Sequence, residues 1–167
     1  MSSFSQWEQD IQLTNYPLQS YTQNVAADSI FIHVVWAKSE GNFLEIFYKK
    51  TSDNGLTWSP DIRLAFIPGT CETPKITVSG NIVHVVWIDH RNGNKQIYYM
   101  RSIDSGDNWS DAVRLINTTY DSEDPQLKCT GTNIHLIWTD VRDGNAEIYY
   151  KKSSNSGINW GNDERLT

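Results

Sequence analysis

The sequence has little that would support a disulfide framework, a nucleic-acid interface or a membrane span. It contains two cysteines, Cys71 and Cys129, and their number and spacing fit neither a disulfide scaffold nor a zinc motif. We therefore expect two free thiols. The net charge of −6 argues against a nucleic-acid partner, because phosphate binding needs a basic surface. No apolar run approaches the roughly 18 residues of a membrane-spanning helix.

The N-terminus also lacks a targeting segment. The first ten residues contain no basic region followed by an apolar one, which is the pattern of a secretory signal. The chain as written is therefore predicted to be cytoplasmic, and it would be secreted only as a fragment of a longer precursor. A length of 167 residues predicts one domain.

One turn motif, by contrast, is present three times: Ser or Thr, then Asp or Asn two residues on, Gly two further, and Trp after three more. Glycine allows the positive φ of a tight reversal. The short acidic or amide side chain accepts hydrogen bonds from the amides that follow it. We interpret the motif as structural, a hairpin tip with the Trp ring beneath it. Its copies are Thr51, Asp53, Gly55 and Trp58; Ser102, Asp104, Gly106 and Trp109; and Ser153, Asn155, Gly157 and Trp160.

Strand-like segments recur with the same period of 51 residues, which separates the tryptophans at positions 7, 58, 109 and 160. Short strands are predicted at 24–27, 75–79 and 126–130, at 31–36, 82–87 and 134–138, and at 45–48, 96–99 and 147–150. A fourth strand follows each of the four tryptophans. Four antiparallel strands per repeat without helical periodicity predict an all-β fold of β-propeller blades. We place three blades at residues 15–65, 66–116 and 117–167, with an extra outer strand at 1–14.

The turn motif resembles the Asp-box, or BNR repeat, of sialidases and sialidase-like propellers. The run from Trp87 to Asn94, which returns from Trp138 to Asn145, is common in the same repeats. The resemblance covers almost the whole chain. It implies that the turn motif lies away from the ligand face. It also implies that function belongs to the loops that join successive blades, and to those between the second and third strands of a blade.

Three blades are too few to close a propeller, which usually has four to eight. An open arc would expose an apolar blade face at each end, and such patches associate. The resemblance implies six blades, so we predict a homodimer that closes a six-bladed ring. The strand at 1–14 would pair with the last blade of the partner, in competition with that blade's own outer strand. The alternative is that the chain is a piece of a longer propeller.

No catalytic residue, metal ligand or cofactor is predicted. The resemblance implies that a sialidase carries an arginine triad, a Tyr nucleophile assisted by a Glu, and an Asp acid/base. Such residues should depart from the repeat, but the arginines recur in register, as Arg63, Arg114 and Arg165 do. The histidines at 33, 84 and 135 also recur, one per blade, too far apart to share an ion. We expect a non-catalytic module, with a glycoside hydrolase complete only as an oligomer as the alternative.

The candidate ligand-binding residues lie in the predicted functional loops. Two Asp–Arg pairs could recognise a polar ligand, either carbohydrate or protein, and nearby loop acids could bind sugar hydroxyls. The competing interpretation is that each Asp ties down its own loop, each Arg pairs with a neighbouring carboxylate and the acids are solvated. A third reading is a structural fragment without a ligand. The candidates are Glu72, Asp89, Arg91, Glu123, Asp124, Asp140 and Arg142.

Overall fold

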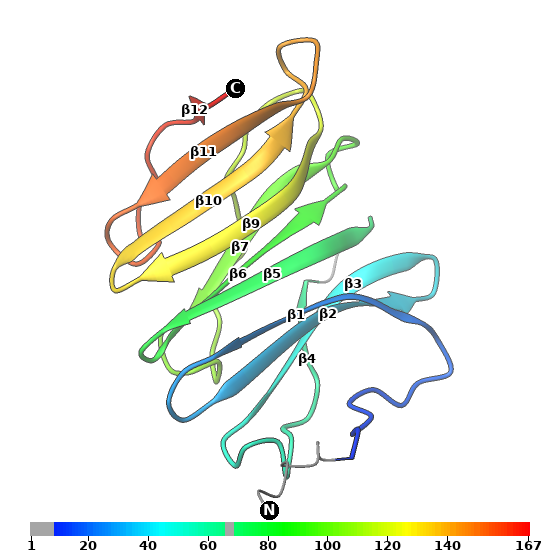
Figure 1. Cartoon of the computed structure of the whole chain (residues 1–167). Helices are drawn as coiled ribbons and strands as arrows, with labels where there is room; N and C mark the ends of the chain where they lie inside the picture. The colour runs from blue at the N-terminus through cyan, green and yellow to red at the C-terminus, as the bar shows by residue number, and fades with distance from the viewer. Residues whose placement is uncertain (1–8, 66–68) are drawn as a thin grey trace, which may run out of the picture.

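The computed structural model describes residues 9–65 and 69–167, which form three four-stranded antiparallel sheets in succession (Figure 1). In each sheet every strand pairs with the next one along the chain. Blade 1 consists of β1 (Ser20–Ala27), β2 (Ile32–Glu40), β3 (Phe43–Thr51) and β4 (Ile62–Ala65). Blade 2 consists of β5 (Cys71–Ser79), β6 (Ile82–Asp89), β7 (Gln96–Ser102) and β8 (Val113–Arg114). Blade 3 consists of β9 (Ser122–Thr130), β10 (Asn133–Asp140), β11 (Glu147–Ser153) and β12 (Glu164–Arg165).

The predicted all-β architecture of four-stranded blades is confirmed, and the described residues contain no helix that could span a membrane. Both cysteines are free thiols, as predicted. The first strand of each blade is longer than predicted because it continues across a bulge. Thr22, Thr73 and Asp124 lie at these bulges with φ values of 46°, 53° and 50°. Two of the three precede a proline, which cannot donate to the ladder and is tolerated at a bulge.

The extra outer strand predicted at 1–14 is not present as a strand in the part that the structure describes. Residues 1–8, which include Trp7, lie outside the described residues, and residues 9–14 pair with no strand of this chain. Nevertheless, Lys49 Nζ donates a 2.8 Å hydrogen bond to the carbonyl oxygen of Leu13. Lys151 Nζ bonds Leu115 of the preceding blade in the same way, at 2.9 Å. Leu13 therefore stands where the outer strand of a blade before blade 1 would stand.

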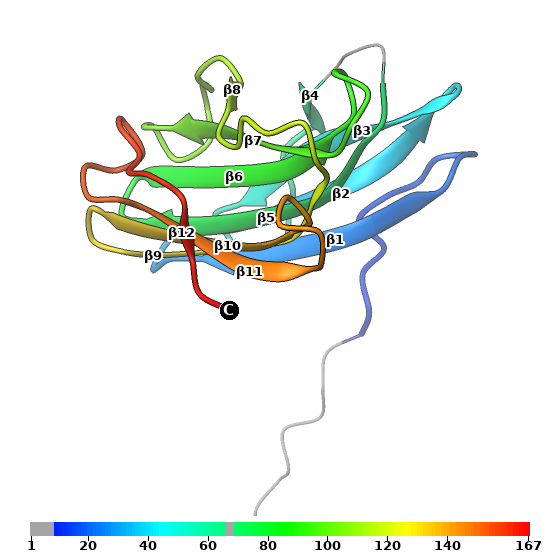
Figure 2. The ribbon, with the colours of Figure 1, turned by 90° about the horizontal axis from the view of Figure 1, so that it is seen from above.

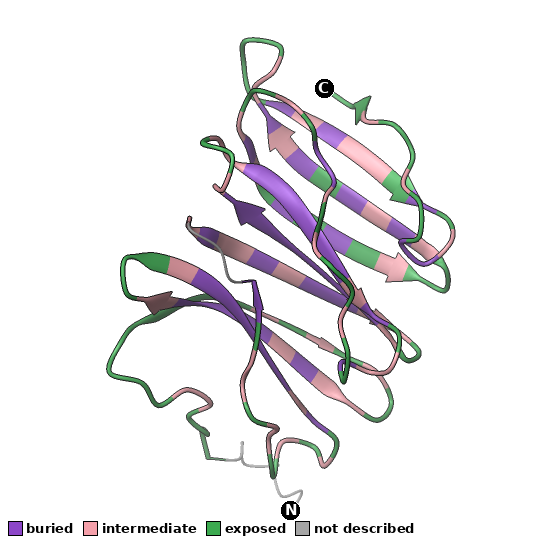
Figure 3. Ribbon diagram, turned by 180° about the vertical axis from the view of Figure 1, so that it is seen from behind, coloured by how far each residue is buried: buried purple, intermediate pink, exposed green. Residues whose placement is uncertain are grey.

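The core lies between the blades. Val35 and Tyr48 of blade 1 pack against Val85 and Trp87 of blade 2 in one cluster. A second cluster joins the opposite face of blade 2 to blade 3. Strands β6 and β7 are consequently buried along nearly their whole length, whereas β10 and β11 alternate between buried and accessible positions (Figure 3). The burial of both faces of β6 and β7 depends on the presence of a blade on each side.

The loops divide between two rims of the arc, seen from above in Figure 2. On the turn rim, the turn motifs lie beside the hairpins between first and second strands, because Ser105 N donates to Asn81 O at 2.8 Å. On the loop rim, the loops between blades (69–70 and 115–121) lie beside the loops between second and third strands (90–95 and 141–146). There Asn94 Nδ2 donates to Tyr120 O at 2.9 Å. The two rims are therefore distinct surfaces.

Candidate functional site

The turn motif uses its polar side chains inside the turn. Ser102 Oγ donates to Asp104 Oδ1 at 2.6 Å and accepts from the amide of Gly106 at 2.8 Å. Asp104 also accepts from the backbone and the side chain of Asn108, at 2.9 and 2.7 Å. These hydrogen bonds, led by that from Ser102, lower the pKa of Asp104 to about 2. The geometry supports a structural role for the motif. The same ring of bonds recurs at Thr51, Asp53, Gly55 and Thr57, and at Ser153, Asn155, Gly157 and Asn159.

The recurring histidines are buried partners of tyrosines. His33 and His84 have no exposed surface, and their Nδ1 atoms lie 2.7 and 2.8 Å from the hydroxyls of Tyr48 and Tyr99. Burial lowers the pKa of both histidines to about 4. Each pair stays within its own blade. Among the described residues, no three His, Cys, Asp or Glu side chains are placed to hold a metal ion.

On the loop rim, Asp89 is enclosed by its own blade. It is fully buried and accepts three hydrogen bonds from Arg91, from N at 3.0 Å, Nε at 2.9 Å and Nη2 at 2.7 Å. Trp87 Nε1 donates a fourth, at 3.0 Å. Burial raises the pKa of this carboxyl, but the hydrogen bonds and the charge of Arg91 outweigh it, so the pKa lies below its ordinary value. Asp140 has equivalent bonds from Arg142 and Trp138.

The arginines of these pairs lie over aromatic rings of their own blade. The guanidinium of Arg91 lies 4.2 Å from the ring centre of Tyr98, and that of Arg142 lies 4.3 Å from that of Tyr149. Their side chains are 28% and 22% exposed, whereas the two carboxylates are at 0%. A ligand could therefore reach an edge of each arginine but neither aspartate. This arrangement matches the interpretation that each Asp ties down its own loop.

The predicted loop acids are brought together by a lysine that was not predicted. Lys95, in the loop between β6 and β7, pairs with Glu123 of blade 3 and lies 3.9 Å from Glu72 of blade 2. His90 Nε2 lies 3.0 Å from Glu72. The hydrogen bond from Lys95 to Glu123 raises the pKa of this lysine. Asp124 is exposed at the bulge of β9. No sequence signal marks Lys95, because this contact crosses from one blade to the next.

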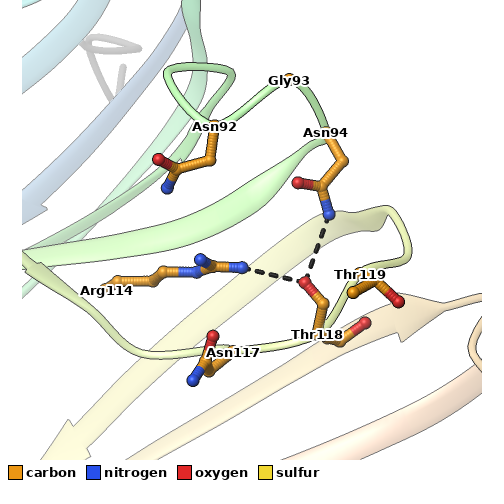
Figure 4. A pocket seen from close by; sticks show the side chains of 7 residues that line it. All are labelled: Asn92, Gly93, Asn94, Arg114, Asn117, Thr118 and Thr119. Atoms are coloured by element: carbon orange, nitrogen blue, oxygen red, sulfur yellow. Dashed lines mark hydrogen bonds between the residues drawn. The ribbon is translucent and has the colours of Figure 1, made fainter.

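The loop rim also contains a cleft of about 470 Å³ between the β6–β7 loop and the loop from blade 2 to blade 3. Arg114 Nη2 at its base donates to the carbonyl oxygen of Thr118 at 2.9 Å, and Asn94 Nδ2 bonds the same oxygen at 3.3 Å (Figure 4). Asn117 and Thr119 are exposed at its edge. The lining consists of Asn92, Gly93, Asn94, Arg114, Asn117, Thr118 and Thr119.

Chemically, this cleft is a hydrogen-bonding surface. Its amides and hydroxyls can both donate and accept, and its arginine is already bonded to backbone carbonyl oxygens. The lining contains no carboxylate, whereas most glycoside hydrolases use a pair of them. None of the lining residues was among the predicted candidates, although both loops were predicted to be functional. Asn and Thr are common in ordinary loops, so their identity alone is not a site signal.

Comparisons with known proteins show the fold. No protein-family model matches the chain, and no curated protein matches it. Among solved structures, the chain is similar to the catalytic domain of the GH62 α-L-arabinofuranosidase of Coprinopsis cinerea, with a TM-score of 0.59 and 15% identity. It is also similar to a family 117 glycoside hydrolase of Zobellia galactanivorans (0.64, 13%) and to Trypanosoma rangeli sialidase in complex with sialic acid (0.62, 13%).

These similarities include 93%, 92% and 85% of this chain but only 53%, 58% and 30% of those proteins, in the same order. The chain therefore spans between 30% and 58% of the length of these proteins. The fold is that of a sialidase-like β-propeller, and three blades correspond to part of a complete ring.

Proposed function

We propose that this chain is a non-catalytic propeller module that binds carbohydrate through the cleft on the loop rim. The observation that carries the proposal is the cleft's lining of side-chain amides and hydroxyls around Arg114. A sugar hydroxyl can donate and accept a hydrogen bond at the same time. The side-chain amides and hydroxyls of the cleft can supply both the acceptor and the donor that it needs. Specific sites commonly consist of a concave surface with a few convergent polar groups.

The known proteins that share the fold favour carbohydrate over other small ligands. The similar structures are two glycoside hydrolases and a sialidase with bound sialic acid. Shared fold alone does not assign function, so this support concerns the ligand class and not the reaction. A protein ligand on the same rim is the competing outcome of the binding experiment below.

The arrangement of carboxylates favours binding over hydrolysis. Asp89 and Asp140 are buried and held by arginines, so neither can reach a substrate. Glu72 and Glu123 both contact Lys95. We also assign the turn motif to the Asp-box of BNR repeats, with no part in ligand binding, because its Asp and Ser side chains bond within the turn.

The test is a glycan array probed with the purified chain, followed by titration of the best ligand. The double variant Asn117→Ala, Thr119→Ala removes two exposed groups at the cleft and should weaken binding at least tenfold. Asn159→Ala is the matched control, because it removes an exposed amide on the turn rim. Its affinity should equal that of the wild type.

Binding to no glycan would refute the proposal. Equal weakening by Asn159→Ala would also contradict it, since the turn rim would then contribute. Turnover of a fluorogenic sialoside that is abolished by changing one loop carboxylate would replace the proposal with a hydrolase.

A further inference from the structure

The two blade junctions inside the chain are built from the same contacts. At the first, Tyr48 of blade 1 packs edge-to-face on Trp109 of blade 2, with ring centres 5.0 Å apart. At the second, Tyr99 of blade 2 packs on Trp160 of blade 3 at 5.3 Å. Each junction therefore inserts a tyrosine of one blade beneath the turn motif of the next.

A glycine makes room for each tyrosine. A Cβ added at Gly106 would lie 2.6 Å from Cζ of Tyr48 and nearer still to its hydroxyl, and one at Gly157 would meet Tyr99 in the same way. Both are closer than real Cβ contacts. The glycine of the turn motif is thus a socket for the tyrosine of the preceding blade, in addition to its positive φ.

A cation completes each junction. Lys50 Nζ of blade 1 donates to the carbonyl oxygen of Ser105 in blade 2 at 2.8 Å. Arg101 Nη1 of blade 2 donates to that of Ser156 in blade 3 at 2.6 Å. Tyrosine, cation, glycine and tryptophan thus form a repeated set across each junction.

The same four residue types are also present on the two outer blades, where they are divided: the tyrosine and the cation belong to blade 3, and the glycine and the tryptophan belong to blade 1. Blade 3 carries Tyr150, already bonded to its histidine, with His135 Nδ1 2.8 Å from its hydroxyl, and Lys152 in the position of Lys50. Blade 1 carries Gly55, where an added Cβ would meet, among the described residues, only its own Trp58 ring, at 3.8 Å. Within the part of the chain that the structure describes, blade 3 therefore has the tyrosine without a socket, and blade 1 has the socket without a tyrosine.

Apolar residues on the outer face of blade 3 are more exposed than their equivalents in blades 1 and 2. Ile137 is 40% exposed, whereas Val35 and Val86 at the equivalent positions are at 0%. Leu166 is 53% exposed, whereas Leu64 and Leu115 are at 9%. The opposite end, on blade 1, has a hollow of about 420 Å³ lined in part by Ile32 and Val34. Apolar faces of this kind are typical of association surfaces.

We propose that the outer face of blade 3 docks onto the open face of blade 1 of a second copy of this chain. Tyr150 is then seated at Gly55 of the partner subunit, and Lys152 reaches the carbonyl oxygen of Asn54 of the partner subunit. The occupant is a second copy because both halves of the junction belong to one chain and continue the two junctions already formed. A head-to-tail interface that closes on itself gives a ring, here six blades from two chains.

In this assembly, two segments compete for the position of one outer strand. Leu13 occupies the position next to Lys49 that the partner's Leu166 would take. In a closed ring, only one of these two leucines can occupy the position next to Lys49.

The test is the mass in solution of the purified chain by light scattering at micromolar concentration. We expect two copies of 19.1 kDa. Gly55→Ala should give a single copy, because a Cβ would fill the socket, and should weaken association at least a hundredfold. Gly93→Ala is the matched control, since φ is +90° there and +89° at Gly55, and nothing lies within 4 Å of the added Cβ. Both variants carry the same backbone strain, so Gly93→Ala should remain dimeric.

A second pair of variants changes no residue with a positive φ and so adds no backbone strain of that kind. Ile137→Asp places a charge on the outer face of blade 3 and should give a single copy, while Ile103→Asp, at an exposed residue of the turn rim, should leave the dimer intact. Circular dichroism checks that each variant is folded. A wild-type chain of one copy, a mass above two copies, or a dimer that survives Gly55→Ala would overturn the proposal. Because no ligand enters this experiment, it fails or succeeds independently of carbohydrate binding.

Discussion

The turn rim and the loop rim of the same three blades follow different rules. On the turn rim, the ring of hydrogen bonds around Ser102 and Asp104 is repeated in every blade, even where Asn155 replaces the aspartate. On the loop rim, the Asp–Arg pair of blades 2 and 3 is absent from blade 1, where Lys38 pairs with Glu40 instead. The turn rim is uniform, and the loop rim varies from blade to blade.

The two rims differ in how freely their residues can change. The turn motifs of blades 2 and 3 each receive a tyrosine of the preceding blade, so a change there must suit two blades at once, as the fit of Tyr48 at Gly106 shows. The loops of the other rim bond mainly to one another, as Asn94 does to Thr118 and Tyr120. Surface loops positioned by a rigid framework are where binding residues concentrate.

Removing one carboxylate from each rim should give the largest difference in stability between the two rims. Asp89→Ala leaves the charge of Arg91 and the indole N–H of Trp87 without their buried acceptor, so we expect a loss of about 3–5 kcal/mol of stability. Asp104→Ala removes hydrogen bonds from an accessible turn, where water can replace them, so it should cost clearly less stability than Asp89→Ala. Urea denaturation of both variants measures the difference. Equal losses would mean that the pair on the loop rim is not an interior ion pair.

Adding one methyl group on each rim should give the reverse order. Gly106→Ala, on the turn rim, overlaps Tyr48 of the adjacent blade and should cost about 3 kcal/mol, from overpacking and from positive φ. Gly93→Ala, on the loop rim, meets no atom within 4 Å and should cost about 1 kcal/mol, from φ alone. Thermal melts compare the two. A similar cost would show that the tyrosine socket is not tight.

Acid should weaken the His–Tyr pairs beneath the turn rim before it affects the carboxylates. The folded pKa of His33 and His84 is about 4, below the ordinary 6.5. Their stabilisation is therefore complete above pH 6.5 and is lost as the pH falls from 6.5 towards 4, because the unfolded chain binds the protons first. The loss should be about 1 kcal/mol per histidine between pH 7.5 and 5.5.

The measurement is the unfolding free energy by urea at a series of pH values. His84→Asn keeps a donor near the hydroxyl of Tyr99 but cannot titrate, so it should remove about half of the dependence in this range. An unchanged slope would place the titrating group elsewhere.

The smallest effect on stability is expected at the cleft. The double variant Asn117→Ala, Thr119→Ala changes two exposed side chains, so stability should change by less than about 0.5 kcal/mol even where glycan affinity falls. A urea melt beside the binding titration checks both values. A large loss of stability would assign these residues to the framework, and the loop rim would then be no more tolerant than the turn rim.

Much of the fold could be predicted, and the site much less. The period of the tryptophans and the β-branched runs predicted the four-stranded antiparallel blades, because those residues serve local turns and strands. The bulges at Thr22, Thr73 and Asp124 were missed, since their positive φ carries no glycine signal. The bridge of Lys95 between Glu72 and Glu123 was missed because it joins two blades. The cleft was missed because its amides and hydroxyls are ordinary loop residues.

The amino-acid pattern alone was enough to predict the repeat unit: its strands, its turn and the three blades of the chain. These depend on interactions a few residues apart, which a periodic pattern records directly. The stacking of the sheets, in contrast, settled that a tyrosine enters the next blade at a glycine, as Tyr48 does at Gly106, and that Ile137 stays exposed on the outer face of blade 3. Contacts of the first kind join residues of different blades, so their existence depends on how whole sheets stack, which no local pattern encodes.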